Sequence, residues 1–178
     1  AVKFQKRDLE SIYQQKILEN PSLDSQGTEI LIDVLKNVEF DEDDFQEIVN
    51  YSKEKKITFL CTPWDIPSVD FLEKLGVSAY KIASADLTNL PLIAHISKLN
   101  KPMIVSTGMS EMEEIEKTVS FMKEKNIVFS LLHCCSTYPS PVELLNLSLI
   151  PILQEKFNVP IGYSGHESSI LPSITAAN

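Results

Sequence analysis

Three side chains with complementary chemistry lie within six positions of one stretch, Tyr80 to Asn89. Lys81 supplies a cation, Ser84 a hydroxyl and Asp86 a carboxylate, at the end of an apolar run typical of a strand. Side chains alternate between the two faces of an extended chain, so the side chains of Lys81 and Ile82 point to opposite faces of the strand. An ammonium beside hydroxyls suits an anionic ligand. The alternative is a buried strand whose lysine reaches solvent, followed by a helix cap.

Polar side chains also stand where the other apolar runs end. They are Gln5, Thr62, Ser84, Ser106 with Thr107, Ser136 and Ser164, and a second lysine, Lys3, precedes Gln5. In a barrel of parallel strands all these ends meet at one face, where barrel enzymes keep their sites. Ser and Thr also cap helices, as we expect of Ser68 and Ser110, but those two stand further along the chain. The strand-end groups therefore favour a site for a small dianion such as a phosphate ester.

Apolar runs alternate with helical patterns along the chain. Strands are expected near 2–5, 57–61, 80–84, 103–108, 127–132 and 159–164, and helices near 28–36, 41–56, 69–75, 90–99, after 110, and 147–157. Residues 6–26 look like a long loop with a short helix at most. This alternation predicts an α/β fold with a parallel sheet. An open doubly wound sheet and a (β/α)₈ TIM-type barrel, truncated at both ends to about six βα units, both fit, and convergence of the strand ends favours the barrel.

Helix boundaries are expected at residues with capping chemistry. Asp41 should begin the helix over 41–56, with Asp44 near its third position. Ser68 should cap the next helix, which Gly76 should end. Ser110 and Glu113 should form a capping box for the helix that follows them.

The composition is that of a globular protein with an acidic surface. The 178 residues carry a formal net charge of −9, which argues against nucleic acid or an anionic membrane as a partner. An anionic substrate would need a local basic pocket, such as Lys3 and Lys81 would supply. The three cysteines form neither a paired framework nor a metal-ligand spacing, which favours a cytoplasmic location. No apolar run approaches the roughly 18 residues of a membrane span.

Other side chains carry chemistry that their spacing leaves open. His166 follows the last predicted strand and is either a metal ligand or an ordinary loop histidine. His133, at the end of another strand, is expected in the core. Cys134-Cys135 should be buried filler, because no base stands at a suitable spacing. Core packing is also expected for Trp64, although it and Tyr138 could wall a pocket.

Six short motifs occur along the chain in a fixed order. They are Lys3-Phe4-Gln5, Phe59 to Asp65, Lys81 to Asn89, Ser106 to Met109, His133 to Pro139, and Ile161 to Glu167. Together they resemble the N-acetylneuraminate (sialic acid) synthase family. Each motif alone is weak, but six in register over nearly the whole chain are specific.

The resemblance implies a (β/α)₈ barrel that condenses phosphoenolpyruvate with N-acetylmannosamine or its 6-phosphate, using a divalent metal, Mn²⁺ or Mg²⁺. It also implies a role for each polar side chain of the motifs. Phosphoenolpyruvate would be held by Lys3, Thr62, Lys81, Ser84, Ser106, Ser136 and Ser164. Gln5 and Tyr138 would touch the sugar, His166 would bind the metal, and Asp86 would orient or deprotonate the attacking water. Lys81 and Asp86 are the side chains expected to be catalytic.

By the same resemblance, residues 1–178 are part of a synthase barrel, and further family features lie outside them. These include the first barrel strand with its glutamate, a second metal histidine and a C-terminal antifreeze-like domain. Family members pair as domain-swapped homodimers. We expect residues 1–178 alone to be inactive, since an unclosed barrel exposes sheet edges. Two alternatives stay open: a synthase of a legionaminic or pseudaminic type of nonulosonic acid, and a catalytically inactive barrel module in surface-polysaccharide biosynthesis.

Overall fold

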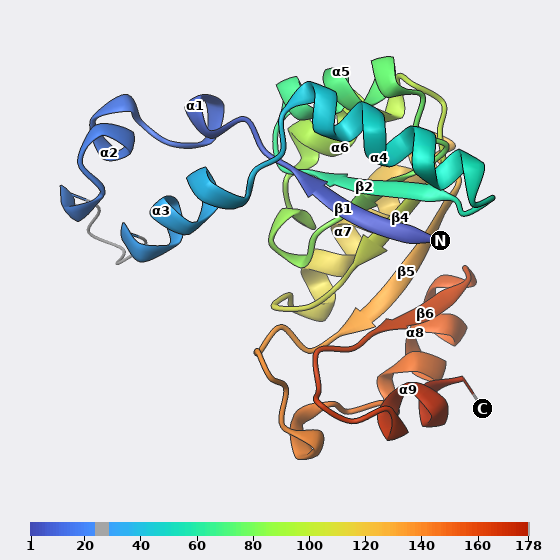
Figure 1. The fold of residues 1–178 in the computed structure, drawn as a ribbon. Helices are drawn as coiled ribbons and strands as arrows, with labels where there is room; N and C mark the ends of the chain where they lie inside the picture. Colours follow the sequence, from blue (N-terminus) through green and yellow to red (C-terminus); the bar gives the residue numbers. More distant parts are fainter. Residues whose placement is uncertain (24–28, 178) are drawn as a thin grey trace. The chain divides into compact units, whose positions relative to one another are not determined.

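The computed structural model describes residues 1–23 and 29–177. The chain divides into two compact units, Ala1–Ser78 and Ala79–Asn178, in each of which strands alternate with helices (Figure 1). The strands are β1 (Val2–Lys6), β2 (Phe59–Pro63), β3 (Tyr80–Ile82), β4 (Met103–Ser106), β5 (Phe129–Cys134) and β6 (Ile161–Ser164). Each overlaps a strand predicted from the sequence. Paired strands within a unit are parallel, as predicted.

The first unit holds β1 and β2, paired with Phe4 opposite Cys61. Its helices are α1 (Leu9–Ile12), α2 (Gln15–Glu19), α3 (Glu29–Val38), α4 (Glu42–Glu54) and α5 (Ile66–Leu75), with a 3₁₀ turn η1 (Pro21–Leu23). In Figure 1, α1, α2 and α3 lie beyond the carboxyl end of β1. No helix of the described residues is long and apolar enough to cross a membrane.

The polar stretch after β1 is more ordered than the sequence predicts. It was expected to hold one short helix at most, yet α1 and α2 both form there. Asp8 begins α1 by accepting a hydrogen bond from the Ser11 N–H at 2.9 Å, a local cap that supports even a four-residue helix. Residues 24–26 of the predicted loop, and Thr28 at the predicted start of α3, lie outside the described residues.

The apolar core of the first unit lies on one face of β1 and β2. Phe4 stacks on Phe59 with ring centroids 5.7 Å apart, and Phe45 of α4 meets Phe59 edge-on at 6.4 Å. Cys61, on the same face, is fully buried. Because side chains alternate along a strand, the aromatic side chains occupy one face of β1 and β2, and the polar side chains lie on the other face.

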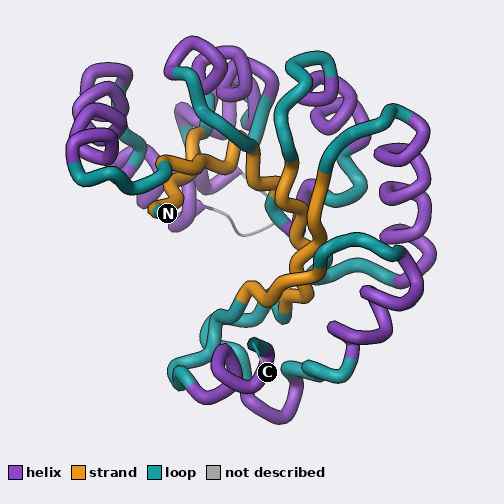
Figure 2. Tube along the Cα trace, turned by 90° about the vertical axis from the view of Figure 1, so that its right-hand side faces the viewer, coloured by secondary structure: helices purple, strands orange, loops and turns teal. Residues whose placement is uncertain are grey.

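The second unit holds β3, β4, β5 and β6, paired in chain order. Its helices are α6 (Leu90–Ser97), α7 (Met112–Glu124), α8 (Leu149–Phe157) and α9 (Leu171–Ala176), with 3₁₀ turns η2 (Ser84–Asp86) and η3 (Val142–Leu144). Figure 2 shows this unit's strands leading through loops into helices, as βα units do. Its strand core comprises Tyr80, Ile82, Met103, Val105 and Leu131, all at most 1% exposed.

Two of the predicted helix boundaries are confirmed. Asp41 and Asp44 form a capping box at the start of α4, in which each side chain accepts a hydrogen bond from the other residue's backbone N–H. Gly76 ends α5 in the left-handed conformation, with φ of 76°, which a residue without Cβ adopts at little cost.

Two predicted caps are wrong. Asp65, not Ser68, caps α5, and the Ser68 N–H donates to Asp65 Oδ1 at 2.6 Å. Likewise Glu111 and Glu114, not Ser110 and Glu113, form the capping box of α7. In both cases donor and acceptor stand three residues apart: the Ser68 N–H donates to Asp65 before it, and the Glu111 N–H donates to Glu114 after it.

The capping box of α4 gives a stability prediction. Asp41→Ala removes the side-chain acceptor of the Asp44 N–H, so we expect the free energy of unfolding to fall by about 1 kcal/mol. Asp43→Ala is the matched control, because Asp43 lies in the same first turn but is not the cap. Urea denaturation followed by circular dichroism measures both. An equal effect of the two substitutions would contradict the capping role.

Candidate functional site

The strands of the second unit present a row of polar side chains on the face opposite the core. The register pairs Lys81 with Ile104 and Cys134 with Ser164. Ser106 lies two positions after Ile104, so alternation places it on the face of Lys81. Lys81, Ser106, Cys134 and Ser164 therefore share one face. The register thus places two of the predicted strand-end groups, Ser106 and Ser164, on the sheet face of Lys81, and their action as one site stays a prediction.

The Ser106 hydroxyl is buried without a hydrogen-bond partner. The residue is 0% exposed, and its Oγ has no partner among the described residues. In the first unit, Thr62 Oγ1 of β2 is likewise buried without a hydrogen-bond partner among the described residues. A buried unsatisfied hydroxyl costs about 1–3 kcal/mol. A fold that keeps such groups at the ends of its strands holds donors ready for a ligand.

Gly108 allows the strand-end serines of the second unit to approach one another. Its backbone N–H donates to Ser84 Oγ at 3.1 Å. A Cβ at this position would lie 2.9 Å from Ser84 Oγ, 3.0 Å from the Cys134 carbonyl oxygen, and closer still to Ser136 Oγ. The sequence reasoning gave Gly108 no role, although a glycine directly after a strand end is a signal of close backbone approach. The loop of Gly108 thus joins Ser84 and Ser136 in one cluster.

Asp86 is buried at the end of the 3₁₀ turn η2. The Asn89 side-chain amide donates to Asp86 Oδ1 at 3.0 Å. Asn89 Oδ1 in turn caps α6 by accepting from the Leu92 N–H at 3.2 Å. One carboxylate oxygen of Asp86 therefore helps to fix the start of α6, and its action on a water molecule stays a prediction.

His166 is held in one tautomer by its neighbours. Its Nδ1 lies 2.9 Å from the Cys135 carbonyl oxygen, which can only accept, so Nδ1 carries the proton. Nε2 then accepts a hydrogen bond from the Tyr138 hydroxyl at 2.9 Å, and the two rings stack with centroids 4.1 Å apart. Tyr138 is 76% exposed. The structure thus brings together the predicted metal ligand and a predicted sugar contact.

The side chains around His166 meet the needs of a divalent metal only in part. A neutral imidazole with its lone pair on Nε2 and its other nitrogen bonded to a carbonyl is the form that binds metal, so His166 fits as one ligand. Among the described residues, no group of three or more His, Cys, Asp and Glu side chains is placed to hold an ion. His166 would therefore share a metal with ligands from elsewhere.

His133 and the two adjacent cysteines were expected in the core, and this is the case for His133 and Cys134. His133 is buried, faces away from Cys134, and lies 2.6 Å through Nε2 from the Leu145 carbonyl oxygen. Its predicted place in the core is confirmed. Cys134 is buried as predicted, but Cys135 is only half-buried, so it does not serve simply as filler.

The three thiols should differ in reactivity. Hydrogen bonds from the Thr137 and Ser140 hydroxyls lower the pKa of Cys135, whereas burial raises the pKa of Cys61 to about 12. Because the thiolate is the nucleophile, we expect iodoacetamide at pH 8 to modify Cys135 first and to leave Cys61 unmodified in the folded protein. Peptide mass spectrometry measures the order.

The cause of the Cys135 reactivity can be tested separately. Thr137→Val removes the hydrogen bond between the Thr137 hydroxyl and the Cys135 sulfur, and should therefore raise the pKa of the thiol and slow its alkylation at pH 7. Thr88→Val, at an exposed position away from the thiol, is the control that should leave the rate unchanged. Rapid labelling of Cys61 in the native protein would contradict the prediction.

In the first unit, Lys3, Gln5 and Thr62 share the strand face opposite the aromatic core. The pKa of the Lys3 ammonium is lowered, chiefly because neighbouring protein removes part of its hydration. The electrostatic influence of Cys61 opposes this shift, and the charge of Arg7 adds to it. Lys3 is thus poised for an anion that would restore the lost interactions of its charge.

Trp64 is not in the core, contrary to the sequence prediction. Its indole N–H donates to Gln5 Oε1 at 2.9 Å, and the ring is partly exposed. The guanidinium of Arg7 lies over the same ring, 4.4 Å from its centroid, and donates to Gln5 Oε1 at 2.6 Å. Arg7 was missed by the sequence reasoning, because its neighbour Trp64 is distant in sequence. The three side chains form a cluster, named here the Arg7 cluster.

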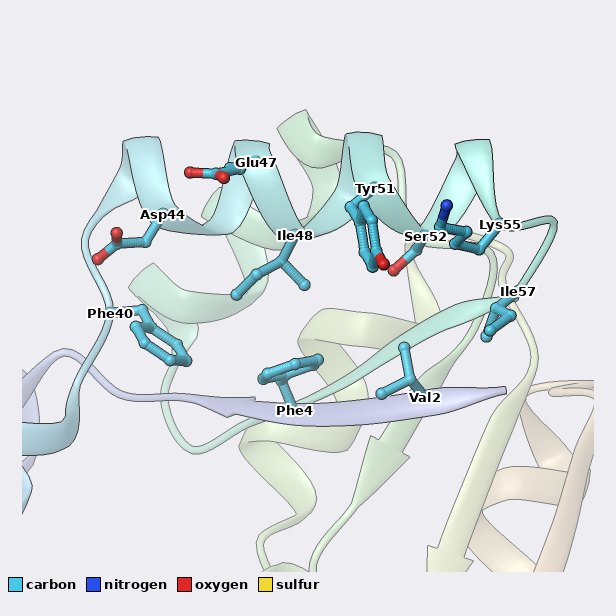
Figure 3. Close-up of a pocket in the computed structure, with 10 residues that line it drawn as sticks. All are labelled: Val2, Phe4, Phe40, Asp44, Glu47, Ile48, Tyr51, Ser52, Lys55 and Ile57. Carbon is cyan, nitrogen blue, oxygen red and sulfur yellow. The ribbon is translucent and has the colours of Figure 1, made fainter.

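An apolar pocket of about 450 Å³ lies elsewhere in the first unit. In Figure 3, Ile48 and Tyr51 of α4 point toward Val2 and Phe4 of β1, while Glu47 lies on the outer side of the helix. Val2 and Phe4 occupy the strand face opposite Lys3. This pocket therefore belongs to the packing side of β1 and is separate from the polar strand face.

Comparisons with known proteins agree with these observations. A family model described as the NeuB family matches residues 1–178. N-acetylneuraminate-9-phosphate synthase of Homo sapiens is 36% identical over 179 residues, which cover 99% of this chain and 50% of that protein. N,N'-diacetyllegionaminic acid synthase of Campylobacter jejuni is 38% identical over 150 residues, covering 82% and 44%. The chain spans about half the length of the curated relatives it matches.

A solved structure supports the same conclusion on the fold. N-acetylneuraminic acid (sialic acid) synthetase from Leptospira borgpetersenii, in complex with citrate, matches with a TM-score of 0.87 and 34% identity. The match covers 99% of this chain and 57% of that one. The predicted TIM-barrel-like α/β fold is confirmed.

Proposed function

Because the chain belongs to the NeuB family, we propose that the full-length protein condenses phosphoenolpyruvate with an N-acylated hexosamine and releases phosphate. The buried, unpartnered hydroxyl of Ser106, on the strand face of Lys81 and Ser164, carries this proposal. Ammonium and hydroxyl donors at strand ends suit the phosphate and carboxylate of phosphoenolpyruvate. The acceptor is N-acetylmannosamine or its 6-phosphate.

The reaction makes one carbon–carbon bond and breaks one carbon–oxygen bond. C3 of phosphoenolpyruvate attacks the aldehyde carbon of the open-chain sugar, whose oxygen takes up a proton. Water adds at C2 and loses a proton, and phosphate then leaves from C2 to give the 2-keto acid. The proposed phosphoenolpyruvate contacts are Lys81, Ser84, Ser106, Ser136 and Ser164 in the second unit, and Lys3 and Thr62 in the first.

The remaining predicted side chains act on the sugar, the water and the metal. Gln5 and Tyr138 contact the sugar, and Asp86 positions the water that adds at C2. His166 would hold a divalent metal, Mn²⁺ or Mg²⁺, through Nε2. Such a metal supplies a Lewis acid that polarises the aldehyde. The stacked Tyr138 ring keeps the imidazole of His166 oriented.

A second acceptor class is favoured by one comparison. The Campylobacter relative is named for N,N'-diacetyllegionaminic acid, and it is as similar to this chain as the human relative is. A synthase that uses a diacetylated hexose precursor of a legionaminic-type acid is therefore the second candidate function.

The direct test is an activity assay of the full-length protein with phosphoenolpyruvate, Mn²⁺ and a panel of N-acylated hexoses with and without a 6-phosphate. We expect hexose-dependent release of phosphate and a nonulosonic acid detected by mass spectrometry. A folded full-length protein that releases no phosphate with any member of the panel would refute the proposed function.

Ser106→Ala tests the observation that carries the proposal. We expect KM for phosphoenolpyruvate to rise about tenfold, because the variant loses a hydrogen bond to an anionic ligand. The ligand-free protein should be as stable as the wild type or more so, because a buried unsatisfied hydroxyl is removed. Ser97→Ala is the control, since the Ser97 hydroxyl is already bonded to the Ala94 carbonyl oxygen. Lower stability with unchanged KM would show that Ser106 is structural.

A further inference from the structure

The Arg7 cluster defined above holds a cation just past the carboxyl end of β1. The Arg7 side chain is 17% exposed. Stacking on Trp64 and the 2.6 Å hydrogen bond to Gln5 Oε1 fix the plane of its guanidinium. A guanidinium fixed in this way meets a planar or tetrahedral oxyanion with little loss of side-chain freedom.

The nearest carboxylate does not occupy the guanidinium fully. Glu39 Oε1 accepts from Lys6 Nζ at 3.3 Å and from the Arg7 backbone N–H at 2.9 Å. Its other oxygen lies 4.0 Å from Arg7 Nη1, beyond hydrogen-bond distance. One carboxylate thus faces two cationic side chains, Lys6 and Arg7. Arg7 keeps N–H donors for a further anion.

The order of side chains along β1 indicates where such an anion would sit. Lys3 and Gln5 alternate onto the same face, and the side chain of Arg7, two positions further on, returns to Gln5. These three side chains therefore follow one another along β1 in the order Lys3, Gln5, Arg7, toward the carboxyl end of the strand. Lys3 is assigned above to phosphoenolpyruvate and Gln5 to the sugar. Arg7 then lies beyond the sugar, on the side away from phosphoenolpyruvate.

Gln5 is oriented by the same contacts. Its Oε1 accepts from both Arg7 and Trp64, so its amide Nε2 points away from them as a donor. That nitrogen has no hydrogen-bond partner among residues 1–23 and 29–177. A sugar hydroxyl or N-acyl oxygen can fill that place while Arg7 holds a group at the far end of the same ligand.

We propose, resting on the function proposed above, that Arg7 is a specificity-determining residue that binds a phosphate on the acceptor sugar. In an open-chain hexose C6 is the carbon furthest from the reacting aldehyde. A phosphate there faces away from phosphoenolpyruvate, as Arg7 does. The acceptor class assigned by this geometry is an N-acylated hexosamine 6-phosphate.

The test measures binding by calorimetry, without turnover. The full-length protein is titrated with N-acetylmannosamine 6-phosphate and, separately, with N-acetylmannosamine, in the presence of Mn²⁺. We expect the wild type to bind the phosphorylated sugar about 10- to 100-fold more tightly, the range for charge-assisted hydrogen bonds. In Arg7→Gln the ratio of the two affinities should fall to about threefold or less. Arg7→Lys keeps the charge but lacks the paired N–H donors of a guanidinium, so it should give an intermediate ratio.

Lys53→Gln is the control, because it removes an exposed cation of the same unit from α4 and should keep the wild-type ratio. The proposal is overturned by a wild-type ratio near one, by absence of sugar binding, or by an Arg7→Gln variant that keeps the ratio. It is also overturned if Arg7→Gln weakens phosphoenolpyruvate binding instead. Because no turnover is needed, failure of the proposed condensation is a separate result, seen as missing phosphate release.

Discussion

Replacing Lys81 by glutamine in the full-length protein is expected to lower kcat/KM for phosphoenolpyruvate by about 10- to 100-fold. Lys81 places a charged nitrogen on the polar face of β3, beside β4, which carries Ser106 on the same face; Ser164 of β6 lies further along that face. Loss of a charge-assisted contact to a dianion costs about 1.5–3 kcal/mol, and 1.4 kcal/mol corresponds to tenfold. Glutamine keeps a donor of similar length but removes the charge.

Stability should respond differently from activity. The core face of β3 is closed by Tyr80 and Ile82, both fully buried, and the side chain of Lys81 lies on the opposite face of the strand. We therefore expect Lys81→Gln to stay folded without substrate and to shift the thermal midpoint by only a few degrees, because the apolar core is unchanged. Lys98→Gln, at an exposed position after α6, controls for a general loss of charge. A less than threefold change in kcat/KM would contradict the assignment of Lys81.

Steady-state kinetics separate binding from catalysis in this variant. A rise in KM with unchanged kcat would mean that Lys81 stabilises bound substrate and transition state equally. A fall in kcat would mean that it contacts charge that develops during the reaction, for example on the leaving phosphate. We expect both, because the phosphate is bound before the reaction and gains charge as it leaves.

The strand positions were predictable because each apolar run is short and bounded by polar or proline residues. The ends of the elements were not. β3 stops at Ile82 because Ser84–Asp86 turns into a 3₁₀ helix, a backbone choice that no spacing of apolar residues encodes. At α5 the sequence offers Asp65 and Ser68, three positions apart, as caps. The extended backbone of Asp65 decides between them.

The polar groups of the candidate site were predictable one by one, because each follows a strand. Their partners were not, since strand pairing decides them. Gln5 and Trp64 are 59 positions apart and meet only because β1 pairs with β2. An aromatic residue after an apolar run is normally expected in the core. Trp64 lies outside it because the strand pairing brings its indole N–H to Gln5. Arg7 gained a role only through that contact.

Gly108→Ala should be the most disruptive single-methyl substitution near the site. The added Cβ would lie 3.0 Å from the Cys134 carbonyl oxygen, which belongs to β5 and cannot turn away as a side chain can. Ser84 and Ser136, whose hydroxyls are closer still, would have to move. Displacing catalytic contacts by about 1 Å lowers rates by about 100-fold, and we expect a loss of kcat/KM of that size. Overpacking should also lower the free energy of unfolding by about 1–3 kcal/mol.

Gly76→Ala separates the two effects of Gly108→Ala. A Cβ at Gly76 meets no atom within 4 Å, but the φ of 76° disfavours any residue with a side chain. This variant should therefore lose about 1 kcal/mol of stability and keep the wild-type kcat/KM. If Gly108→Ala lost stability to the same extent and retained activity, the close approach at Gly108 would serve packing alone. Loss of activity beyond the loss of stability would instead show that Gly108 positions the serines, because the methyl added at Gly76 meets no atom and therefore displaces none of them.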